Sequence, residues 1–439
     1  MPLRVTVIGT GYLGVTHAAG LAESGCDVLG VDVDADKIAA LASGSVPFHE
    51  PGLDELLAQH VATGRLRFTT SFADAGAFGD VHYLCVGTPQ RRDGLGADLS
   101  YLENAVDALA PHLRGQCLVV GKSTVPVGTA DRLATRLSTQ APANGDVELA
   151  WNPEFLREGS AVADTLRPDR IVVGVRSEIA EKLLREVYAT QVDDGVPFVV
   201  TDVATAELVK VAANAFLATK VSFMNAMAEM CEATGADVVA LRDALGRDER
   251  IGRRYLHAGL GFGGGCIPKD IRALMAQAGE LGVDQAVTFL AEVDAINMSR
   301  RTRMVGLAEG ACGGSALGKR IGVLGASFKP NSDDIRDSPA LNVAAQLQLH
   351  GATVCVYDPA ARANAEKAFP ALHYADSVLE AANGAHVLLH LTEWDEFREL
   401  DPRSLHGVVA HKYILDGRNA LDAEHWRREG WIYRGLGRP

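Results

Sequence analysis

The chain has 439 residues, enough for two or three domains with well-buried cores. Its composition, 47% hydrophobic and 22% charged, is that of an ordinary globular protein, and the net charge is −14. This acidic balance argues against a general nucleic-acid binder or a protein of acidic membranes, although a local cationic pocket for a small anion remains compatible with it. Seven scattered cysteines without a C-x-x-C pair predict reduced thiols and a cytoplasmic location.

The N-terminal half begins with a strand–helix–strand pattern. Residues 3–9 (LRVTVIG) form a short apolar strand, a helical pattern follows to Gly25, and a second strand covers 27–34. This start predicts neither a signal peptide nor, with no run of 18 apolar residues, a membrane span. Further strands are predicted at 80–89, 117–124, 147–153, 170–175 and 197–202. Because such units stack into parallel sheets, residues 1 to about 202 are expected to form a doubly wound α/β domain.

A long helix is predicted next. Asp202 is a suitable N-cap and Gly235 a suitable C-terminal stop, so the helix has about 30 residues and a length of roughly 45 Å. Helical segments continue to about residue 312, and CGGS (312–315) has the composition of a linker.

The C-terminal half repeats the beginning of the chain. KRIGVLGAS (319–327) has the pattern of the first strand, and Gly351 precedes Asp358 by the same seven residues that separate Gly25 from Asp32. A charged insert, KPNSDDIRDS, replaces the glycine pattern of the first half. We therefore expect two similar domains, of which only the first carries a standard dinucleotide site.

That site is predicted by G-x-G-x-x-G at Gly9, Gly11 and Gly14, between a strand and a helix. The first two glycines permit a tight turn and close approach of a pyrophosphate, and the third permits helix–strand packing. Asp32 ends the next strand, where a carboxylate binds a ribose 2′-hydroxyl and repels a 2′-phosphate, so NAD is favoured over NADP. The alternative is a glycine-rich turn in an unliganded α/β domain.

Cys266 is the candidate nucleophile. It follows the glycines of GLGFGGGC and precedes Pro268, which suits the first turn of a helix. A helix N-terminus and the neighbouring Lys269 both stabilise a thiolate and lower the pKa of a thiol. The alternative, a small buried residue in a loop, is the interpretation adopted for the other six cysteines.

Three further features can carry chemistry. Lys210 and Asn214 are spaced i, i+4 on one face of the long helix, although a helical lysine is usually a solvated charge. STVPVG (123–128) and NPEFLREG (152–159) each follow a strand end, where ligands gather in open α/β sheets. Each of these two segments, 123–128 and 152–159, could also be an ordinary turn.

Taken in order, the motifs resemble those of the UDP-glucose and GDP-mannose 6-dehydrogenase family over essentially the whole chain. They are GTGYLG, VDVD, VGTP, KSTVPVG, NPEFLREG, ELVKVAANAFLATKVSF, DERIG, GFGGGCIPKD, SFKPNSDDIRDSPA, YDPA, LTEWDEF and DGRN. The resemblance implies two Rossmann-like doubly wound domains joined by a long central helix, which also forms a homodimer interface. The expected segments are 1–202 for NAD, 203–312 for dimerisation with the cysteine loop, and 316–439 for the nucleotide sugar.

The resemblance also implies the chemistry. Such enzymes oxidise the C6 alcohol of a nucleotide-linked hexose to a carboxylate and reduce two NAD⁺. Because an aldehyde is a poor hydride donor, a cysteine thiolate adds to it and forms a thiohemiacetal, which is a better one. Oxidation of the thiohemiacetal gives a thioester, and the thioester is then hydrolysed. LTEWDEF and DGRN look most like the UDP-glucose members. GDP-mannose and dTDP-glucose remain alternatives, since a methyl-sized difference is worth only ~1–3 kcal/mol in a pocket.

The residue roles implied by the resemblance fall into three groups, with no metal ligand among them. The catalytic group is Cys266, Lys210, Asn214, Asp270, Thr124, Glu158 and Glu154. The cofactor group is Gly9, Gly11, Tyr12, Leu13, Gly14, Asp32, Lys37, Thr88, Thr124, Glu158, Lys269 and Arg336. The substrate group is Phe155, Leu156, Arg157, Glu158, Lys210, Asn214, Tyr255, Leu256, His257, Ala258, Gly259, Gly263, Lys329 and, reaching the partner subunit's substrate, Arg250.

Two positions depart from the family pattern. Gly265 stands where many members carry serine or tyrosine, and Ala226 follows Asn225 where an acid is common.

Two other classes of function stay open: an NAD-binding regulator on a dehydrogenase fold, and a two-electron hydroxyacid dehydrogenase. Neither class needs Cys266.

Overall fold

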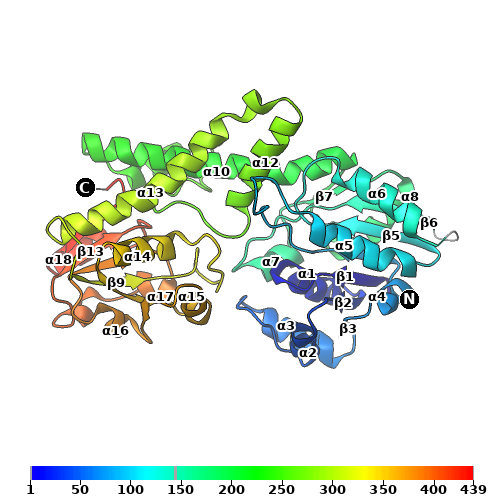
Figure 1. The fold of residues 1–439 in the computed structure, drawn as a ribbon, viewed down its shortest axis with the longest axis horizontal. Coiled ribbons are helices and arrows are strands. Elements are labelled where there is room, and N and C mark those ends of the chain that lie inside the picture. The colour runs from blue at the N-terminus through cyan, green and yellow to red at the C-terminus, as the bar shows by residue number, and fades with distance from the viewer. Residues whose placement is uncertain (1, 143–145, 439) are drawn as a thin grey trace. The chain divides into compact units, whose positions relative to one another are not determined.

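The computed structural model describes residues 2–142 and 146–438. It divides into two compact units, Met1–Ala213 with Arg272–Gln277, and Asn214–Ile271 with Ala278–Pro439. Each unit is built around one twisted sheet with helices on both faces (Figure 1). The expected domain limits at residues 1 and 439 lie outside the described residues.

In the first unit, the described residues form a sheet in the order β3-β2-β1-β4-β5-β6-β7-β8. Neighbouring strands are parallel except β6 and β7, which meet in one antiparallel bridge between Trp151 and Gly174. The order 3-2-1-4-5-6 is that of a Rossmann fold, whose strand order reverses between β1 and β4. The strands are β1 (Arg4–Ile8), β2 (Asp27–Val31), β3 (Leu66–Thr69), β4 (Val81–Leu84), β5 (Gln116–Gly121), β6 (Asp146–Trp151), β7 (Ile171–Gly174) and β8 (Phe198–Thr201).

Apolar side chains alternate across this sheet and bury both of its faces. Val5 and Val7 of β1 pack with α1, α3 and α8, whereas Ile8 and Leu29 pack with α4, α5 and α6. A doubly wound domain results, because helices cover each face. The helices are α1 (Tyr12–Glu23), α2 (Ala35–Ala42), α3 (Leu53–Ala62), α4 (Phe72–Phe78), α5 (Ser100–Leu109), α6 (Thr129–Gln140), α7 (Ala161–Leu166), α8 (Glu178–Val187) and α9 (Ala189–Asp193).

The long helix α10 (Val203–Thr234) leads from the first unit into the second, as predicted. Asp202 caps its N-terminus by accepting a hydrogen bond of 2.8 Å from the Thr205 N–H. Gly235 ends it in the left-handed region, with φ +76°, where a residue with a side chain would be strained. The helices that follow are α11 (Val238–Leu245), α12 (Ile267–Glu280) and α13 (Phe289–Ala311).

The second unit repeats the Rossmann order in a sheet β11-β10-β9-β12-β13-β14, parallel throughout its described strands. Helices α13 and α14 pack on one face, and α16 to α18 on the other. The strands are β9 (Arg320–Leu324), β10 (Thr353–Tyr357), β11 (His373–Tyr374), β12 (Val387–His390), β13 (Tyr413–Asp416) and β14 (Ile432–Gly435). The helices are α14 (Pro339–Leu349), α15 (Arg362–Ala368), α16 (Val378–Ala382), α17 (Asp395–Arg398) and α18 (Ala423–Arg428).

The expected fold class is thus what the structure has. Strand β3 was missed because its four residues, LRFT, are too short to show a period. Among the described helices, none is long and apolar enough to cross a lipid bilayer.

Candidate active site

The turn between β1 and α1 is shaped to receive a phosphate. Gly9 has φ +93°, and a side chain there would meet the Cys85 carbonyl oxygen at 2.9 Å. A side chain on Gly14 would collide with the Gly9 carbonyl. Gly11 differs: its missing Cβ would point into open space, and no described side chain caps α1 there. First-turn N–H groups and an open approach fit the pyrophosphate of a dinucleotide.

Asp32 lies beside this turn at the end of β2 and is already strongly hydrogen-bonded. Its Oδ2 accepts from the Thr10 N–H at 2.8 Å, the Thr10 hydroxyl at 2.9 Å and the Lys37 ammonium at 3.0 Å. Its Oδ1 accepts from the Asp34 N–H at 3.1 Å. Burial alone would raise the pKa of Asp32, but these hydrogen bonds outweigh burial and lower it. An ionised carboxylate remains, with acceptor capacity on Oδ1 for a ribose hydroxyl.

Hydrogen bonds connect the loops that follow β4 and β5, at the carboxyl ends of the strands of the first sheet. The Thr88 hydroxyl donates to the Thr124 carbonyl at 2.7 Å, and Ser123 donates to the Val86 carbonyl at 2.6 Å. These loops follow strands next to the point where the sheet order reverses, which is where open α/β sheets bind ligands.

Lys122 is a functional candidate that the sequence analysis missed. It is buried after β5, 2.9 Å from Oε2 of Glu154 and 3.1 Å from Oδ1 of Asn152. The other Glu154 oxygen accepts from the N–H groups of Phe155 and Leu156, at 2.5 and 2.8 Å. Both oxygens of Glu154 therefore hold the loop that carries the predicted substrate residues. A lysine directly after the apolar strand CLVVG was the available signal.

Cations gather around Phe155 in that loop. The Arg170 guanidinium lies 3.9 Å from the ring centroid, and the Lys210 ammonium lies 5.6 Å from it. The predicted substrate residue Arg157 is paired with Asp164, at 2.6 Å. The loop ends at α7, where the N–H groups of Gly159, just before the helix, and Ala161, its first residue, donate to the buried Glu50 carboxylate.

The second unit holds the candidate nucleophile. Cys266 directly precedes α12, and its side chain is exposed, whereas the other described cysteines are buried or partly buried. One turn on, Asp270 is only 1% exposed. Its Oδ1 accepts from the Lys269 ammonium at 2.5 Å and its Oδ2 from the Asn214 side-chain amide at 2.6 Å. Asn214 lies one helical turn after Lys210 on α10.

Comparison with known proteins decides the family. Three models of the UDP-glucose/GDP-mannose dehydrogenase family match this chain. The model of the NAD binding domain matches residues 3–192, that of the central domain matches residues 204–299, and that of the UDP binding domain matches residues 322–423. A UDP-glucose 6-dehydrogenase of Rhizobium meliloti is 44% identical over 439 residues, covering 100% of both chains. The chain belongs to the UDP-glucose/GDP-mannose dehydrogenase family.

Solved structures agree with this assignment. A UDP-glucose dehydrogenase from Pyrobaculum islandicum is 37% identical, with a TM-score of 0.92, covering 100% of this chain and 98% of that one. A UDP-D-ManNAc dehydrogenase from Pyrococcus horikoshii is 28% identical, with a TM-score of 0.85 and 99% coverage of each chain. The resemblance of the motifs, the enzyme class and the NAD cofactor are confirmed.

In this dehydrogenase, the glycines before Cys266 pack closely against other segments of the same chain. Added side chains would meet the Gly417 carbonyl at Gly259, the Asn297 amide at Gly261, the Asp337 carbonyl at Gly263, the Phe328 ring at Gly264 and the Arg336 guanidinium at Gly265. The family resemblance implies that two of them, Gly259 and Gly263, bind the nucleotide sugar. Their contacts give another reason for them: the loop can pack here only without side chains.

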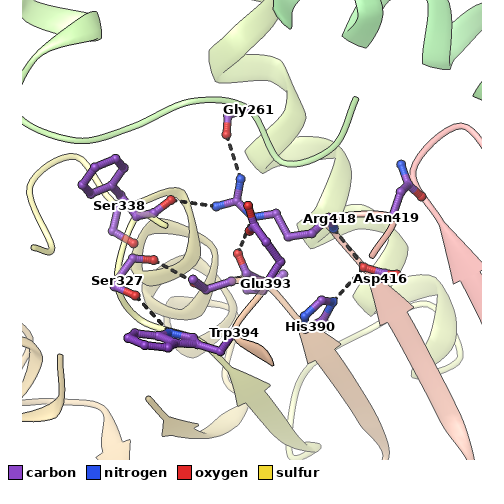
Figure 2. A network of polar contacts seen from close by, with 12 residues as sticks. Gly261, Ser327, Ser338, His390, Glu393, Trp394, Asp416, Arg418 and Asn419 are labelled. Atoms are coloured by element: carbon purple, nitrogen blue, oxygen red, sulfur yellow. Dashed lines mark hydrogen bonds and ion pairs between the residues drawn. The ribbon is translucent and has the colours of Figure 1, made fainter. Parts of the chain in front are cut away.

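Arg418 and Asn419, in the motif DGRN, fasten the same loop. The Arg418 guanidinium donates to the Gly261 carbonyl at 3.0 Å (Figure 2). It also donates to the carbonyls of Leu391 and Phe328, at 2.7 and 3.1 Å. Asn419 donates to the Ala258 carbonyl at 3.1 Å. The role of these two side chains could not be predicted from the motif, because the carbonyls they bind belong to distant segments.

Asp358, the counterpart of Asp32 in the second unit, accepts hydrogen bonds on both of its oxygens. Its Oδ2 accepts from the N–H groups of Ala326 and Ser327, at 2.7 and 3.0 Å, and from the Trp394 indole at 3.2 Å. Its Oδ1 accepts from two more N–H groups, those of Ala360 and Ala361. The protein's own donors occupy this carboxylate, whereas Asp32 keeps acceptor capacity.

Four non-glycine residues in loops of the second unit have a left-handed backbone. Among the described residues, the non-glycine residues with positive φ are Tyr255, Asn331, Asp337 and Asn419, between +45° and +63°. All four lie in quoted motifs or beside them, and strain of this kind clusters at functional sites.

The remaining predicted substrate residues differ in burial and in the contacts they make. Leu256 and Ala258 are buried in an apolar cluster with α10, so only their main chain can meet a ligand. His257 accepts from Arg242 at 3.1 Å. The Lys329 ammonium lies 5.2 Å from the Phe328 ring centroid. The Arg250 side chain is 89% exposed and paired with Asp248, at 2.6 Å.

Proposed function

We propose that this protein oxidises the C6 alcohol of UDP-glucose to the carboxylate of the uronic acid, with Cys266 as a covalent nucleophile. The observation that carries the proposal is the exposed Cys266 thiol at the start of α12, one turn from a buried carboxylate with fixed donors on both oxygens. A two-electron hydroxyacid dehydrogenase or an NAD-binding regulator needs no such arrangement. The choice of UDP-glucose is supported by relatives that are UDP-glucose 6-dehydrogenases, such as those of Rhizobium meliloti and Bacillus subtilis, at 44% and 38% identity.

The proposed chemistry has four steps. The C6 alcohol loses a proton and a hydride and becomes an aldehyde. The Cys266 thiolate adds to the aldehyde carbon and forms a C–S bond. The resulting thiohemiacetal loses a second hydride and becomes a thioester. Water cleaves the C–S bond, which gives the acid and regenerates the thiol. NAD⁺, when bound, accepts the hydride in each oxidation.

The roles of the other residues in this reaction are proposals of the same kind. Lys210 and Asn214 stabilise the oxyanion that develops at C6. Asp270 orients the hydrolytic water or takes its proton, and Thr124, Glu154 and Glu158 line the reacting carbon and the nicotinamide. Gly9, Gly11, Tyr12, Leu13, Gly14, Asp32, Lys37, Thr88, Lys269 and Arg336 bind NAD. Phe155, Leu156, Arg157, Tyr255, Leu256, His257, Ala258, Gly259, Gly263 and Lys329 bind the nucleotide sugar.

A homodimer formed along α10 is also part of the proposal. Phe216, Phe223 and Met230 recur every seven residues on this helix, which places them on one face, and they are 67%, 51% and 57% exposed. Large apolar side chains in such a row suit a second copy of the same helix. Arg250 would then reach the substrate of the partner subunit.

The segments 1–202, 203–312 and 316–439 are proposed to act as NAD-binding, dimerisation and nucleotide-sugar-binding parts, in the cytoplasm. The whole proposal is tested by measuring NADH and sugar acid across UDP-glucose, dTDP-glucose, GDP-mannose and UDP-N-acetylhexosamines. The expected result is two NADH per acid with UDP-glucose as the best substrate. One NADH per sugar, or no turnover of any nucleotide sugar, would contradict it.

A further inference from the structure

Gly265, directly before Cys266, lies against the guanidinium of Arg336. A Cβ atom at this position would stand 2.5 Å from Nη1 and 2.7 Å from Nε of Arg336, too close for non-bonded atoms. Serine or tyrosine, which the resemblance leads one to expect here, would displace the guanidinium. The glycine by which this chain departs from the family pattern at position 265 therefore leaves room for the Arg336 guanidinium.

The carboxylate of Asp334 holds the Arg336 guanidinium in this place. Its Nε lies 2.9 Å from both oxygens of Asp334, and its Nη2 lies 2.6 Å from Oδ2. Asp334 is only 4% exposed, and the Arg336 carbonyl accepts from the Gly264 N–H at 2.9 Å. The guanidinium atom nearest to the added Cβ is Cζ, at 2.4 Å, with Nη1 and Nε almost as close, so the guanidinium group as a whole lies against Gly265.

The positive charge thus lies beside the residue that precedes the thiol. The α-carbons of Gly265 and Cys266 are one peptide unit, about 3.8 Å, apart. Lys269, which the sequence suggested as the activating cation, instead bonds the Asp270 carboxylate at 2.5 Å. Lys269 and Arg336 are thus each paired with a carboxylate, and Arg336 is the cation whose side chain lies against the residue preceding Cys266.

We propose that the Arg336 guanidinium, admitted by the missing side chain of Gly265, favours the thiolate form of Cys266. Arg336 is then a positioning residue that acts through the cysteine, in addition to any contact with NAD. The inference rests on the proposed function only in taking Cys266 as the reactive thiol. A cation close to a thiol favours its ionised form, and the neighbouring Asp334 reduces the effect without reversing it.

The test is the pH dependence of Cys266 alkylation by iodoacetamide, in the full chain without NAD or substrate. Iodoacetamide is uncharged, so its rate reports the thiolate fraction, and peptide mass spectrometry separates Cys266 from the other cysteines. In Arg336→Gln, the pH midpoint should rise by roughly half a unit to one unit, with alkylation at pH 7 slower by about 3- to 10-fold. Arg336→Lys, which keeps the charge, should shift the midpoint less.

Gly265→Ala should raise the midpoint in the same direction, since its Cβ displaces the guanidinium. The control is Gly279→Ala, on the helix that follows Cys266, where an added Cβ meets nothing within 4 Å and should change nothing. Gly265→Ala combined with Arg336→Gln should shift no further than Arg336→Gln alone. Circular dichroism verifies folding, and Gly265→Ala and Arg336→Lys serve if Arg336→Gln is misfolded.

An unchanged midpoint in folded Arg336→Gln, or additive shifts in the double variant, would overturn the inference. Alkylation needs no turnover, so this outcome is distinct from failure of the proposed function. That failure would appear as full acid production by a Cys266→Ser variant.

Discussion

The ammonium of Lys122 lies 2.9 Å from the Glu154 carboxylate, in a place where the two side chains are only 5% and 17% exposed. Through the other carboxylate oxygen, this pair fixes the N–H groups of Phe155 and Leu156. The Phe155 ring in turn meets the Lys210 ammonium. A buried ion pair after β5 therefore reaches, in three contacts, a residue proposed to stabilise the oxyanion.

Replacing Lys122 with Met should destabilise this arrangement strongly. The substitution leaves the Glu154 carboxylate buried without its cation, which costs about 3–5 kcal/mol of the free energy of unfolding. Adding Glu154→Gln should recover much of the loss, since the amide oxygen can still accept the two N–H groups. Urea unfolding of both single variants and the double variant measures the coupling. Lys367→Met, at an exposed position, is the control, and equal small losses in both lysine variants would contradict the expectation.

Much of the fold was predictable because its signals are local. Alternation in LRVTVIG, the cap at Asp202 and the stop at Gly235 each act within a few residues of the chain. The repeated spacing of Gly25 to Asp32 and Gly351 to Asp358 gave the second Rossmann-like fold. The same signals failed at β3, where four residues carry no period.

The candidate site was predictable as a set of residue types but not as a set of contacts. Motifs and spacing point to Cys266, Asn214 and Asp32, and the family resemblance adds Asp270; the roles of all four stay predictions. The partners that fix the site come from distant segments: Lys122 holds Glu154 from 32 positions away, and Arg418 reaches Gly261 from 157 positions away. No local pattern encodes such pairs, and for the same reason the contacts of the glycines before Cys266 with other segments could not be predicted.

Asp32→Ala should weaken NAD binding and narrow the preference for NAD over NADP. The variant loses the ribose acceptor and also leaves the Lys37 ammonium, 3.0 Å away in the native protein, without its carboxylate. A freed cation there would favour a 2′-phosphate. Calorimetric titration should show a dissociation constant for NAD raised about tenfold, a loss of ~1.4 kcal/mol. Lys37→Met is the control: it should not improve NADP binding. Unaltered constants for both cofactors would exclude Asp32 as the ribose ligand.

Acid should destabilise the protein through His82. Burial lowers the pKa of His82 to about 4, against an opposing effect of Asp80. The folded pKa lies below the unfolded value of about 6.5, so stability is lost as pH falls from about 6.5 toward 4. Between pH 7 and pH 5, this one group should remove about 2 kcal/mol of the free energy of unfolding.

The variant that checks this is His82→Asn, whose amide cannot titrate but can still bond the Thr6 hydroxyl, which lies 2.7 Å from Nδ1 of His82. Urea unfolding at pH 7 and pH 5 should show a smaller difference between the two pH values than in the wild type. His406→Asn, at an exposed histidine, should keep the full difference. A wild-type slope in His82→Asn would show that other groups cause the acid loss.

Phe223→Asp should separate the proposed dimer. Phe223 is the middle residue of the exposed row on α10, and a carboxylate there would be buried against its own copy. Light scattering after gel filtration should give the mass of a monomer, while circular dichroism stays unchanged because the side chain is exposed in the single chain. Leu349→Asp, at a residue 85% exposed in the second unit, is the control. A Phe223→Asp dimer as stable as the wild type would place the interface elsewhere.

Cys266→Ser tests the covalent step itself. A serine hydroxyl has nearly the shape of the thiol but is almost never ionised near neutral pH. The first oxidation, alcohol to aldehyde, needs no bond to the enzyme and should survive in part. The second needs the adduct, and an ester formed by serine would hydrolyse less readily than a thioester. Acid formation should therefore fall by several orders of magnitude, a change of about 4 kcal/mol or more in activation free energy.

The products of that variant distinguish a lost nucleophile from a damaged fold. A damaged fold would bind NAD and UDP-glucose poorly and make neither aldehyde nor acid. A lost nucleophile leaves binding intact, so aldehyde or a sugar–enzyme ester should accumulate and be visible by intact mass spectrometry. Cys312→Ser, at a partly buried cysteine after α13, is the matched control and should make two NADH per acid like the wild type. Near-normal acid production by Cys266→Ser would mean that the aldehyde is oxidised without a thiol, as its hydrate, and that the exposed cysteine serves another purpose.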